Sequence, residues 1–99
     1  MGRQAEVNRI VIRVEFFGIP RSRTGVPTVD LELPAPVVLD DVWAALRGRF
    51  PDFAKDCLTD GNLDARFVAN IGGKRFVRAR HTQLIDGDSL LILSADAGG

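Results

Sequence analysis

The chain has 99 residues, a length that fits one domain with one modest core. Thirteen basic and thirteen acidic residues give a formal net charge of zero, which argues against a protein that works on nucleic acid or anionic lipid. A single cysteine rules out a disulfide framework. The N-terminal stretch lacks the long apolar run that a signal peptide or a membrane span requires. We therefore expect a cytoplasmic protein.

Two alternating stretches predict a β-hairpin at the start of the domain. Residues 10–17 (IVIRVEFF) place apolar side chains at every second position, with Arg13 and Glu15 between them. Residues 28–33 (TVDLEL) repeat this pattern. The segment between them, residues 18–27, contains proline and glycine and is expected to be a loop.

The pattern then changes to the period of a helix, which we expect from Asp40 to Phe50. Its apolar stripe consists of Leu39, Val42, Trp43, Leu46 and Phe50. We expect Asp40 to cap the N-terminus and Pro51 to end the helix. Residues 52–58 could add a short turn, and residues 59–62 (TDGN) are expected to be a loop.

A second hairpin and a last strand complete the predicted sheet. Residues 66–71 and 74–78 read as strands joined by Gly72-Gly73. After a turn at residues 86–88 comes the last strand, residues 90–93 (LLIL), which is apolar on both sides and is expected in the middle of the sheet.

This order predicts an α+β fold of two layers, with one main helix packed across one face of a mixed sheet. The expected core under the helix consists of Ile10, Ile12, Val14, Phe16, Val29, Leu31 and Leu33. Val11, Phe17 and one side of Leu91 and Leu93 then have no layer to cover them. They are either a partner surface or scattered surface side chains.

No catalytic constellation is evident. One cysteine, Cys57, and one histidine, His81, are too few for an ordinary metal site, and a packed or solvent-facing role is favoured for each over a Cys/His dyad. The sequence IGGKR at residues 71–75 lacks the spacing of a phosphate-binding loop and is better read as a turn. The basic cluster at residues 74–80 is either a solvated strand edge or a docking patch for an acidic protein.

The C-terminal pair Gly98-Gly99 directs attention to the chain end. Residues 95–99 are slim enough to enter a narrow channel, and we expect them to form a flexible tail on a domain of residues 1–94. Glycine has no Cβ to crowd an attack on its own carbonyl. A partner enzyme could therefore adenylate Gly99 and exchange AMP for sulfur or an amine.

Four segments, taken in order, resemble one family. They are VEFFGIPRSRTG, VVLDDVWAALRGRFPDF, FVANIGGKRF and LIDGDSLLILSADAGG. The set is similar to the MoaD/ThiS sulfur-carrier family of ubiquitin-like β-grasp proteins, and it resembles the MoaD type, the molybdopterin synthase small subunit, more than the shorter ThiS type. Ser94-Ala95-Asp96 stands where the MoaD type commonly has two prolines.

The resemblance implies a carrier protein and not an enzyme, with no bound cofactor or metal. An E1-like activating enzyme would use ATP to adenylate Gly99 beside Gly98, and a sulfur donor would then form a thiocarboxylate. The large subunit of molybdopterin synthase would receive the tail. Other sulfur pathways, for thiamine or cysteine, stay open, as do a ubiquitin-like protein modifier and a plain interaction module.

We expect the partners to bind the exposed apolar residues and the tail. These residues are Phe17, Phe76, Leu91, Leu93, Ala95, Asp96 and Ala97.

Overall fold

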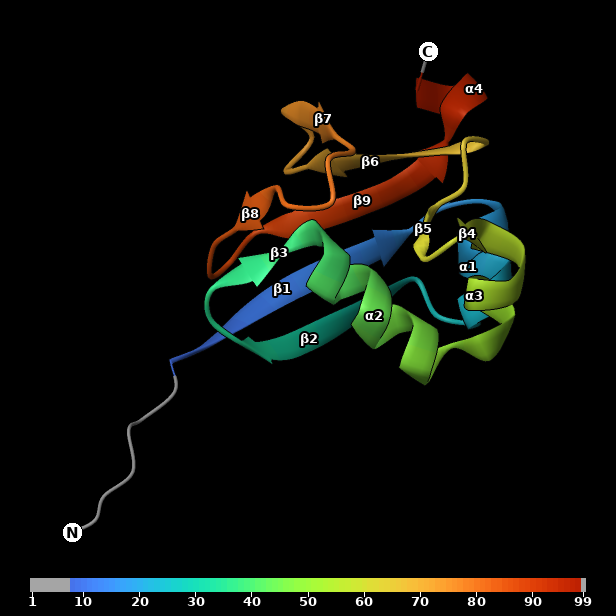
Figure 1. The fold of residues 1–99 in the computed structure, drawn as a ribbon. Coiled ribbons are helices and arrows are strands. Elements are labelled where there is room, and N and C mark those ends of the chain that lie inside the picture. The colour runs from blue at the N-terminus through green and yellow to red at the C-terminus, as the bar shows by residue number, and fades with distance from the viewer. Residues whose placement is uncertain (1–7, 99) are drawn as a thin grey trace, which may run out of the picture.

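The computed structural model describes residues 8–98 and shows a five-stranded sheet with a helical layer across one side (Figure 1). In their order across the sheet, the strands are β2 (Thr28–Pro34), β1 (Arg9–Phe16), β9 (Ser89–Ser94), β6 (Phe67–Ile71) and β7 (Arg75–Val77). Strands β1 and β9 run parallel and the other neighbours antiparallel, so the sheet is mixed. The last strand lies in the centre, which confirms the expectation drawn from its apolar character.

Helix α2 (Leu39–Arg49) packs its apolar stripe onto the sheet, as the sequence predicts. Trp43 and Leu46 are fully buried, whereas Phe50, just beyond the helix, is only partly buried. The cap differs from the expected one, because Val38 and not Asp40 occupies the N-cap position. Asp41 Oδ2 accepts a hydrogen bond from the Val38 N–H at 2.9 Å, which leaves Asp40 free to pair with an arginine.

The first N–H groups of α2 find their partners on another segment. The N–H of Leu39 donates to the carbonyl of Thr82, and the N–H of Asp40 donates to the carbonyl of Arg80. The strand connection that carries these carbonyls is therefore part of the helix cap. This explains why no Ser, Thr or Asp side chain is needed at the N-cap itself.

The expected loop between the first two strands is wrong in part, because it contains helix α1 (Ile19–Thr24). Gly18 precedes this helix with a φ of 61° and a ψ of −129°, a backbone conformation that essentially only glycine adopts. Gly25 ends it in the left-handed region and donates its N–H to the carbonyl of Arg21. Pro20 is tolerated in the first turn, where a helix needs no N–H donor.

Short elements complete the fold, and they replace some expected turns and loops. Helix α3 (Pro51–Cys57) takes the place of the short turn expected there, and Pro51 stands at its beginning. The expected loop at residues 59–62 is instead a small hairpin of β4 (Leu58–Thr59) and β5 (Asn62–Leu63). Strands β3 (Val37–Val38) and β8 (Gln83–Leu84) pair with each other.

The core lies between the sheet and the helices. Ile12, Val14 and Phe16 of β1 are buried as expected, but Ile10 and Leu33 are only partly buried because they lie at the ends of their strands. The short elements contribute core residues that the sequence pattern did not single out: Val37, Phe53, Cys57, Leu63 and Leu84. Among the aromatic contacts, Phe16 packs against Phe53 with a ring-centroid distance of 5.7 Å.

After β9 the chain forms a four-residue helix, α4 (Ala95–Gly98). We expected no regular structure in these residues, so the helix differs from the prediction. The flexibility of residues 95–99 stays a prediction. Gly99 lies outside the described residues. Between residues 8 and 98, no helix is long and apolar enough to cross a membrane.

Candidate functional site

The side of the five-stranded sheet away from α2 carries a row of side chains that crosses four strands. We call this side the open face. The strand register places Phe76 of β7 opposite Asn70 of β6, Asn70 opposite Leu91 of β9, and Leu91 beside Glu15 of β1. Residues opposite one another in neighbouring strands share a face of the sheet. The open face therefore holds two of the predicted docking residues, Phe76 and Leu91, in one row.

A second row brings in the other two predicted apolar docking residues. Leu93 of β9 lies opposite Val68 of β6, and its neighbour Ile92 faces the core. Phe17 follows the last paired residue of β1 and donates its N–H to the carbonyl of Ile92 at 3.1 Å, which sets it beside Leu93 in the register. Phe17 is 40% exposed and Phe76 is 56% exposed, while Leu91 and Leu93 are half-buried. The four residues thus form one apolar surface, as a partner surface requires.

Asn70 is a residue of this face that the sequence reading missed. It is only 6% exposed, and its Oδ1 atom has neither solvent contact nor a hydrogen-bond partner in the described structure. An unpaired buried amide oxygen costs about 1–3 kcal/mol. The sequence gives no signal of this burial, because one polar residue between the apolar Ala69 and Ile71 is the alternation expected of a strand with a solvent-facing side.

The tail leaves the sheet at the end of β9. The N–H of Ala95 donates to the carbonyl of Arg66 at 2.8 Å, and the N–H of Asp96 donates to Ser94 Oγ at 3.3 Å. A surface pocket of about 380 Å³ lies at this point, with Ile19 of α1 in its wall beside Ala95 and Asp96. Ile19 is 47% exposed, so the apolar surface of Phe17 and Leu93 continues to the root of the tail. The side chain of Ala97 lies outside what the structure describes.

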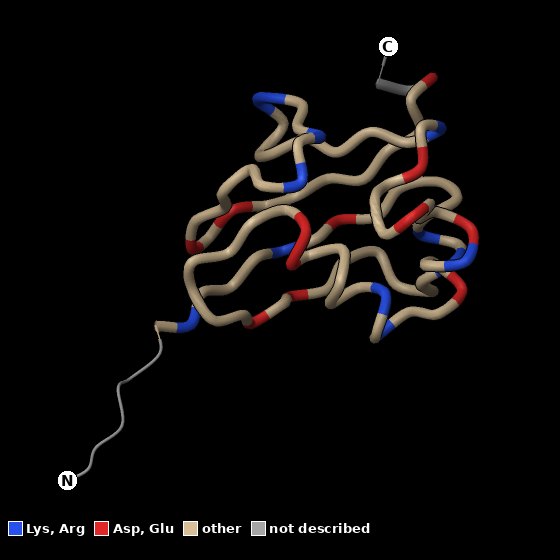
Figure 2. The backbone as a smooth tube through the Cα atoms, viewed as in Figure 1, with Lys and Arg blue, Asp and Glu red and all other residues tan. Residues whose placement is uncertain are grey.

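Basic side chains gather on the edge strand β7 and its flanking turns (Figure 2). The ion pairs of residues 8–98 use Arg80, which binds Asp40 Oδ1 at 2.7 Å, but they do not use Lys74, Arg75 or Arg78. Arg78 donates instead to the carbonyl of Leu63. Three positive charges without an acidic partner therefore flank Phe76, and a negatively charged surface would complement them.

A hydrogen-bonded cluster around Asp64, between β5 and β6, holds the β4–β5 hairpin near the root of the tail. Asp64 accepts hydrogen bonds from the N–H of Arg66, the hydroxyl of Thr59 and the guanidinium of Arg66. Together these bonds hold the pKa of Asp64 well below its usual range, and the bond from the Arg66 N–H has the largest effect. Arg66 also donates to the carbonyl of Asp56 in α3. The cluster thus links residues 64–66 to Thr59 of β4 and to Asp56 of α3.

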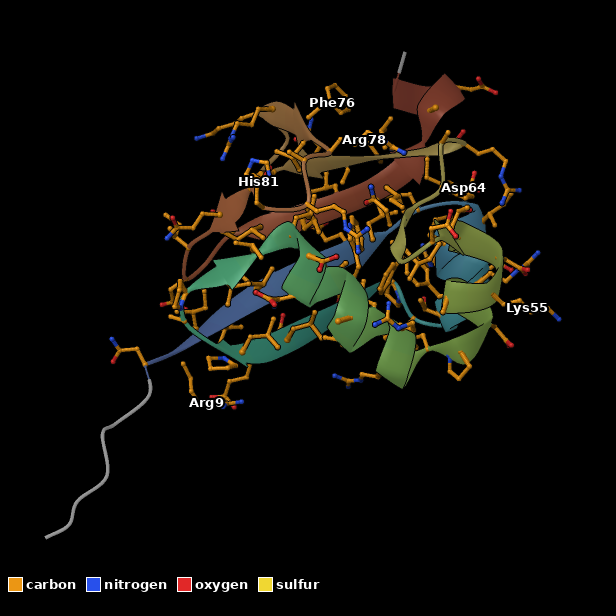
Figure 3. The ribbon with its side chains drawn as sticks, viewed as in Figure 1. Arg9, Lys55, Asp64, Phe76, Arg78 and His81 are labelled. Atoms are coloured by element: carbon orange, nitrogen blue, oxygen red, sulfur yellow. The ribbon has the colours of Figure 1, made fainter. Side chains whose placement is uncertain are left out.

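Cys57 and His81 do not meet. Cys57 is fully buried at the end of α3, and burial, followed by the charge of Asp56, raises the pKa of its thiol to about 11. His81 lies in the connection before β8, on the opposite side of the molecule from α3 and its Lys55 (Figure 3). Within residues 8–98, no group of three or more His, Cys, Asp or Glu side chains is arranged to hold a metal ion.

Comparison with known proteins finds likeness in structure. No protein-family model matches the chain, and no curated protein sequence matches it. Solved structures do match: SAMP1 of Haloferax volcanii has a TM-score of 0.77 at 21% identity, over 90% of this chain and 99% of SAMP1. A putative molybdopterin converting factor subunit 1 of Pyrococcus furiosus has a TM-score of 0.72 at 24% identity, over 86% and 97%.

CysO, in the BexX/CysO complex of Amycolatopsis orientalis, gives a TM-score of 0.70 at 22% identity, over 89% of this chain and 99% of the matched chain. These proteins share the ubiquitin-like β-grasp fold. The chain therefore has the ubiquitin-like β-grasp fold, which confirms the expected fold class. At identities below 25% the likeness concerns the fold, and the activity has to be argued from the face and the tail.

Proposed function

We propose that this protein is a sulfur carrier that works through the carboxylate of Gly99. The observation that carries the proposal is the course of β9. This strand crosses the centre of the open face and leads directly into the segment that ends in Gly98-Gly99. One binding event can therefore hold the domain by the open face and guide the diglycine end into a partner.

The reach of the tail limits where the partner can bind. Five residues, 95–99, span at most about 17 Å when fully extended. An enzyme that acts on Gly99 must therefore approach within this distance of the end of β9. Its surface would then meet Ile19, which lines the pocket at this point, together with Leu93 and Phe17 at the same end of the open face.

The proposed reaction has two steps. In the first, the Gly99 carboxylate attacks the α-phosphorus of ATP in an E1-like activating enzyme, which forms an acyl-adenylate and releases pyrophosphate. In the second, hydrosulfide attacks the acyl carbon and displaces AMP, which leaves a thiocarboxylate after loss of the sulfur-bound proton. The carrier contributes a terminal residue without a Cβ, and the activating enzyme binds the ATP. We place this chemistry in the cytoplasm, where ATP and reduced sulfur are available.

The proposed recipient is the large subunit of molybdopterin synthase, with this chain as the non-catalytic small subunit. The likeness to a putative molybdopterin converting factor subunit supports this choice. The likeness to CysO supports the alternative of a carrier for another sulfur pathway, such as cysteine synthesis. Both roles need the same thiocarboxylate, so they differ only in the protein that accepts the tail.

A second candidate function is protein modification, which the likeness to SAMP1, a small archaeal modifier protein, favours. The same acyl-adenylate would then react with a lysine amine in place of sulfur. The two functions give different products. A carrier yields a C-terminal thiocarboxylate, and a modifier yields an amide bond to lysine.

Pyrophosphate exchange with an E1-class adenylating enzyme of the source organism tests the proposal. The chain ending at Gly99 should support ATP–pyrophosphate exchange, and a chain truncated after Ala97 should not. With a sulfur donor present, intact mass spectrometry should detect the replacement of one oxygen by sulfur at the C-terminus. Equal exchange with both chains would refute the proposal. A product joined to lysine, with no thiocarboxylate, would establish the modifier instead.

A further inference from the structure

Asn70 is enclosed on the open face although it is a polar residue between apolar cross-strand neighbours. Its cross-strand neighbours are Phe76 on one side and Leu91 on the other. Their register places both side chains over the same face of the sheet as the carboxamide. No part of residues 8–98 donates a hydrogen bond to Oδ1 of Asn70. A buried acceptor without an internal donor is suited to a donor that arrives from outside.

Phe76 is the part of this enclosure that can move. It belongs to the edge strand β7, which has only three residues, and its side chain is 56% exposed. Leu91, in contrast, lies in the central strand and is half-buried. A rotamer change of Phe76 would therefore open a path to Asn70 with little loss of packing, whereas a movement of Leu91 would disturb the centre of the sheet.

We propose that Asn70 is a specificity-determining residue of the open face: Phe76 turns aside, and an N–H group of the bound protein donates a hydrogen bond to Asn70 Oδ1. The proposal rests on the proposed function, because the bound protein is the one that processes the tail. Its surface is apolar around the donor, so that it covers Leu91 and the displaced Phe76 ring. A surface without the donor would leave Oδ1 unpaired and would be rejected.

The position of the tail and the charges near Asn70 indicate which protein binds the open face. The short tail brings its processing enzyme onto the end of β9, and the open face is continuous from there to Asn70 through Leu93 and Leu91. On the far side of Asn70, Lys74 lies in the turn before β7 and takes part in no ion pair of residues 8–98, while Arg75 lies opposite the core-facing Ile71. The matching enzyme surface therefore carries acidic residues at this border of the contact.

The test uses Asn70→Leu in the full chain, with the activating enzyme as the probe. Leucine has a similar size but offers no acceptor. The variant should match or exceed the denaturant midpoint of the wild type, because no internal hydrogen bond is lost and a buried unpaired oxygen is removed. Its KM in ATP–pyrophosphate exchange should rise about tenfold with kcat unchanged, which corresponds to one lost hydrogen bond at the interface. Ile85→Asn, which changes an exposed apolar residue in another pocket, is the matched control and should leave both constants unchanged.

A measurement on the unaltered chain complements the variant. Titration with the activating enzyme should move the carboxamide ¹³Cγ resonance of Asn70 downfield, as expected when Oδ1 accepts a hydrogen bond. An unchanged KM for Asn70→Leu, or a resonance that does not move on saturation, would overturn the proposal. So would an unfolded Asn70→Leu chain, because it would assign the carboxamide an internal role. If the wild type supports no exchange at all, the proposed function fails before Asn70 is tested.

Discussion

The backbone N–H of Ala95 donates a hydrogen bond to the carbonyl oxygen of Arg66 over 2.8 Å. This bond extends the pairing of β9 with β6 one residue beyond Ser94, which lies opposite Phe67. The sheet thus holds the chain as far as Ala95. The last fully buried residue before it is Ile92, so the core ends before the tail begins.

Two truncations should therefore differ in stability. Removal of Gly98-Gly99 should change the free energy of unfolding by less than about 0.5 kcal/mol, because the sheet contacts end at Ala95. Removal of residues 95–99 should lower it by about 0.5–1.5 kcal/mol, because the bond to Arg66 is lost. Urea denaturation of the three chains measures both effects. A marked loss on removing the two glycines alone would contradict a tail that is independent of the fold.

Two glycines should respond to alanine with opposite signs. No heavy atom lies within 4 Å of the place where a Cβ would stand at Gly18 or Gly48, so neither substitution causes a clash. Gly18 has a φ of 61° and a ψ of −129°, where alanine is strained, and Gly18→Ala should cost about 1–3 kcal/mol. Gly48 lies in α2, and Gly48→Ala should stabilise the fold by about 0.5–1 kcal/mol. Thermal unfolding would reveal the sign of each change, and two shifts of the same sign would contradict the argument.

The core prediction concerns the contact between α2 and the sheet. Leu46 and Ile12 are both fully buried, and Leu46→Ala or Ile12→Ala leaves a cavity in the layer between them. Each should lower the free energy of unfolding by about 2–5 kcal/mol. Ile85→Ala, at a side chain that is 63% exposed, is the control and should stay within about 0.5 kcal/mol. Similar denaturant midpoints for all three variants would mean that the helix does not cover these positions.

Periodicity was sufficient to predict the elements that are long enough to show it. The alternation in residues 10–17 and 28–33 identified β1 and β2, and the spacing of Trp43 and Leu46 identified α2. The apolar run of β9 also predicted its central place. Helix α1 has only six residues, with one buried side chain, Pro20, so it offers no period to detect.

The capping and docking details depend on contacts distant in sequence. Asp40 lacks a capping role because Arg80 and Thr82 supply carbonyls to the helix from a segment about 40 residues away. The place of Asn70 opposite Phe76 and Leu91 follows from the strand register, which the strand pattern alone does not fix. The surface position of Phe17 and of the outer side of Leu91 and Leu93 was predictable because these residues are left over after the core is assigned.

Acid should weaken the cluster around Asp64. The hydrogen bonds from Arg66 and Thr59 lower the pKa of Asp64, so the native state favours its charged form more than the unfolded state does. The resulting stability is present above about pH 4, the unfolded value, and is lost as the pH falls towards the lowered native pKa. The difference in unfolding free energy between wild type and Asp64→Asn should therefore shrink between pH 5 and lower pH. A difference that stays constant across this range would show that the charge of Asp64 contributes nothing.

Alkaline pH should weaken the fold through Cys57. Burial is the main cause that raises the pKa of its thiol from 9.0 to about 11, so the native state keeps the proton over a range in which the unfolded chain releases it. Because the unfolded state binds fewer protons there, the stability due to the neutral thiol is fully present below about pH 9 and falls as the pH rises towards 11.

Denaturation of the wild type and of Cys57→Ala at several pH values between 8 and 11 isolates this effect, because the two chains share every other titrating group. The wild type should lose stability more steeply than the variant above pH 9. The variant should start lower, because alanine leaves a cavity beside α3 where Cys57 is fully buried. Parallel curves for the two chains would show that the buried thiol ionises as readily in the folded protein as in the unfolded one.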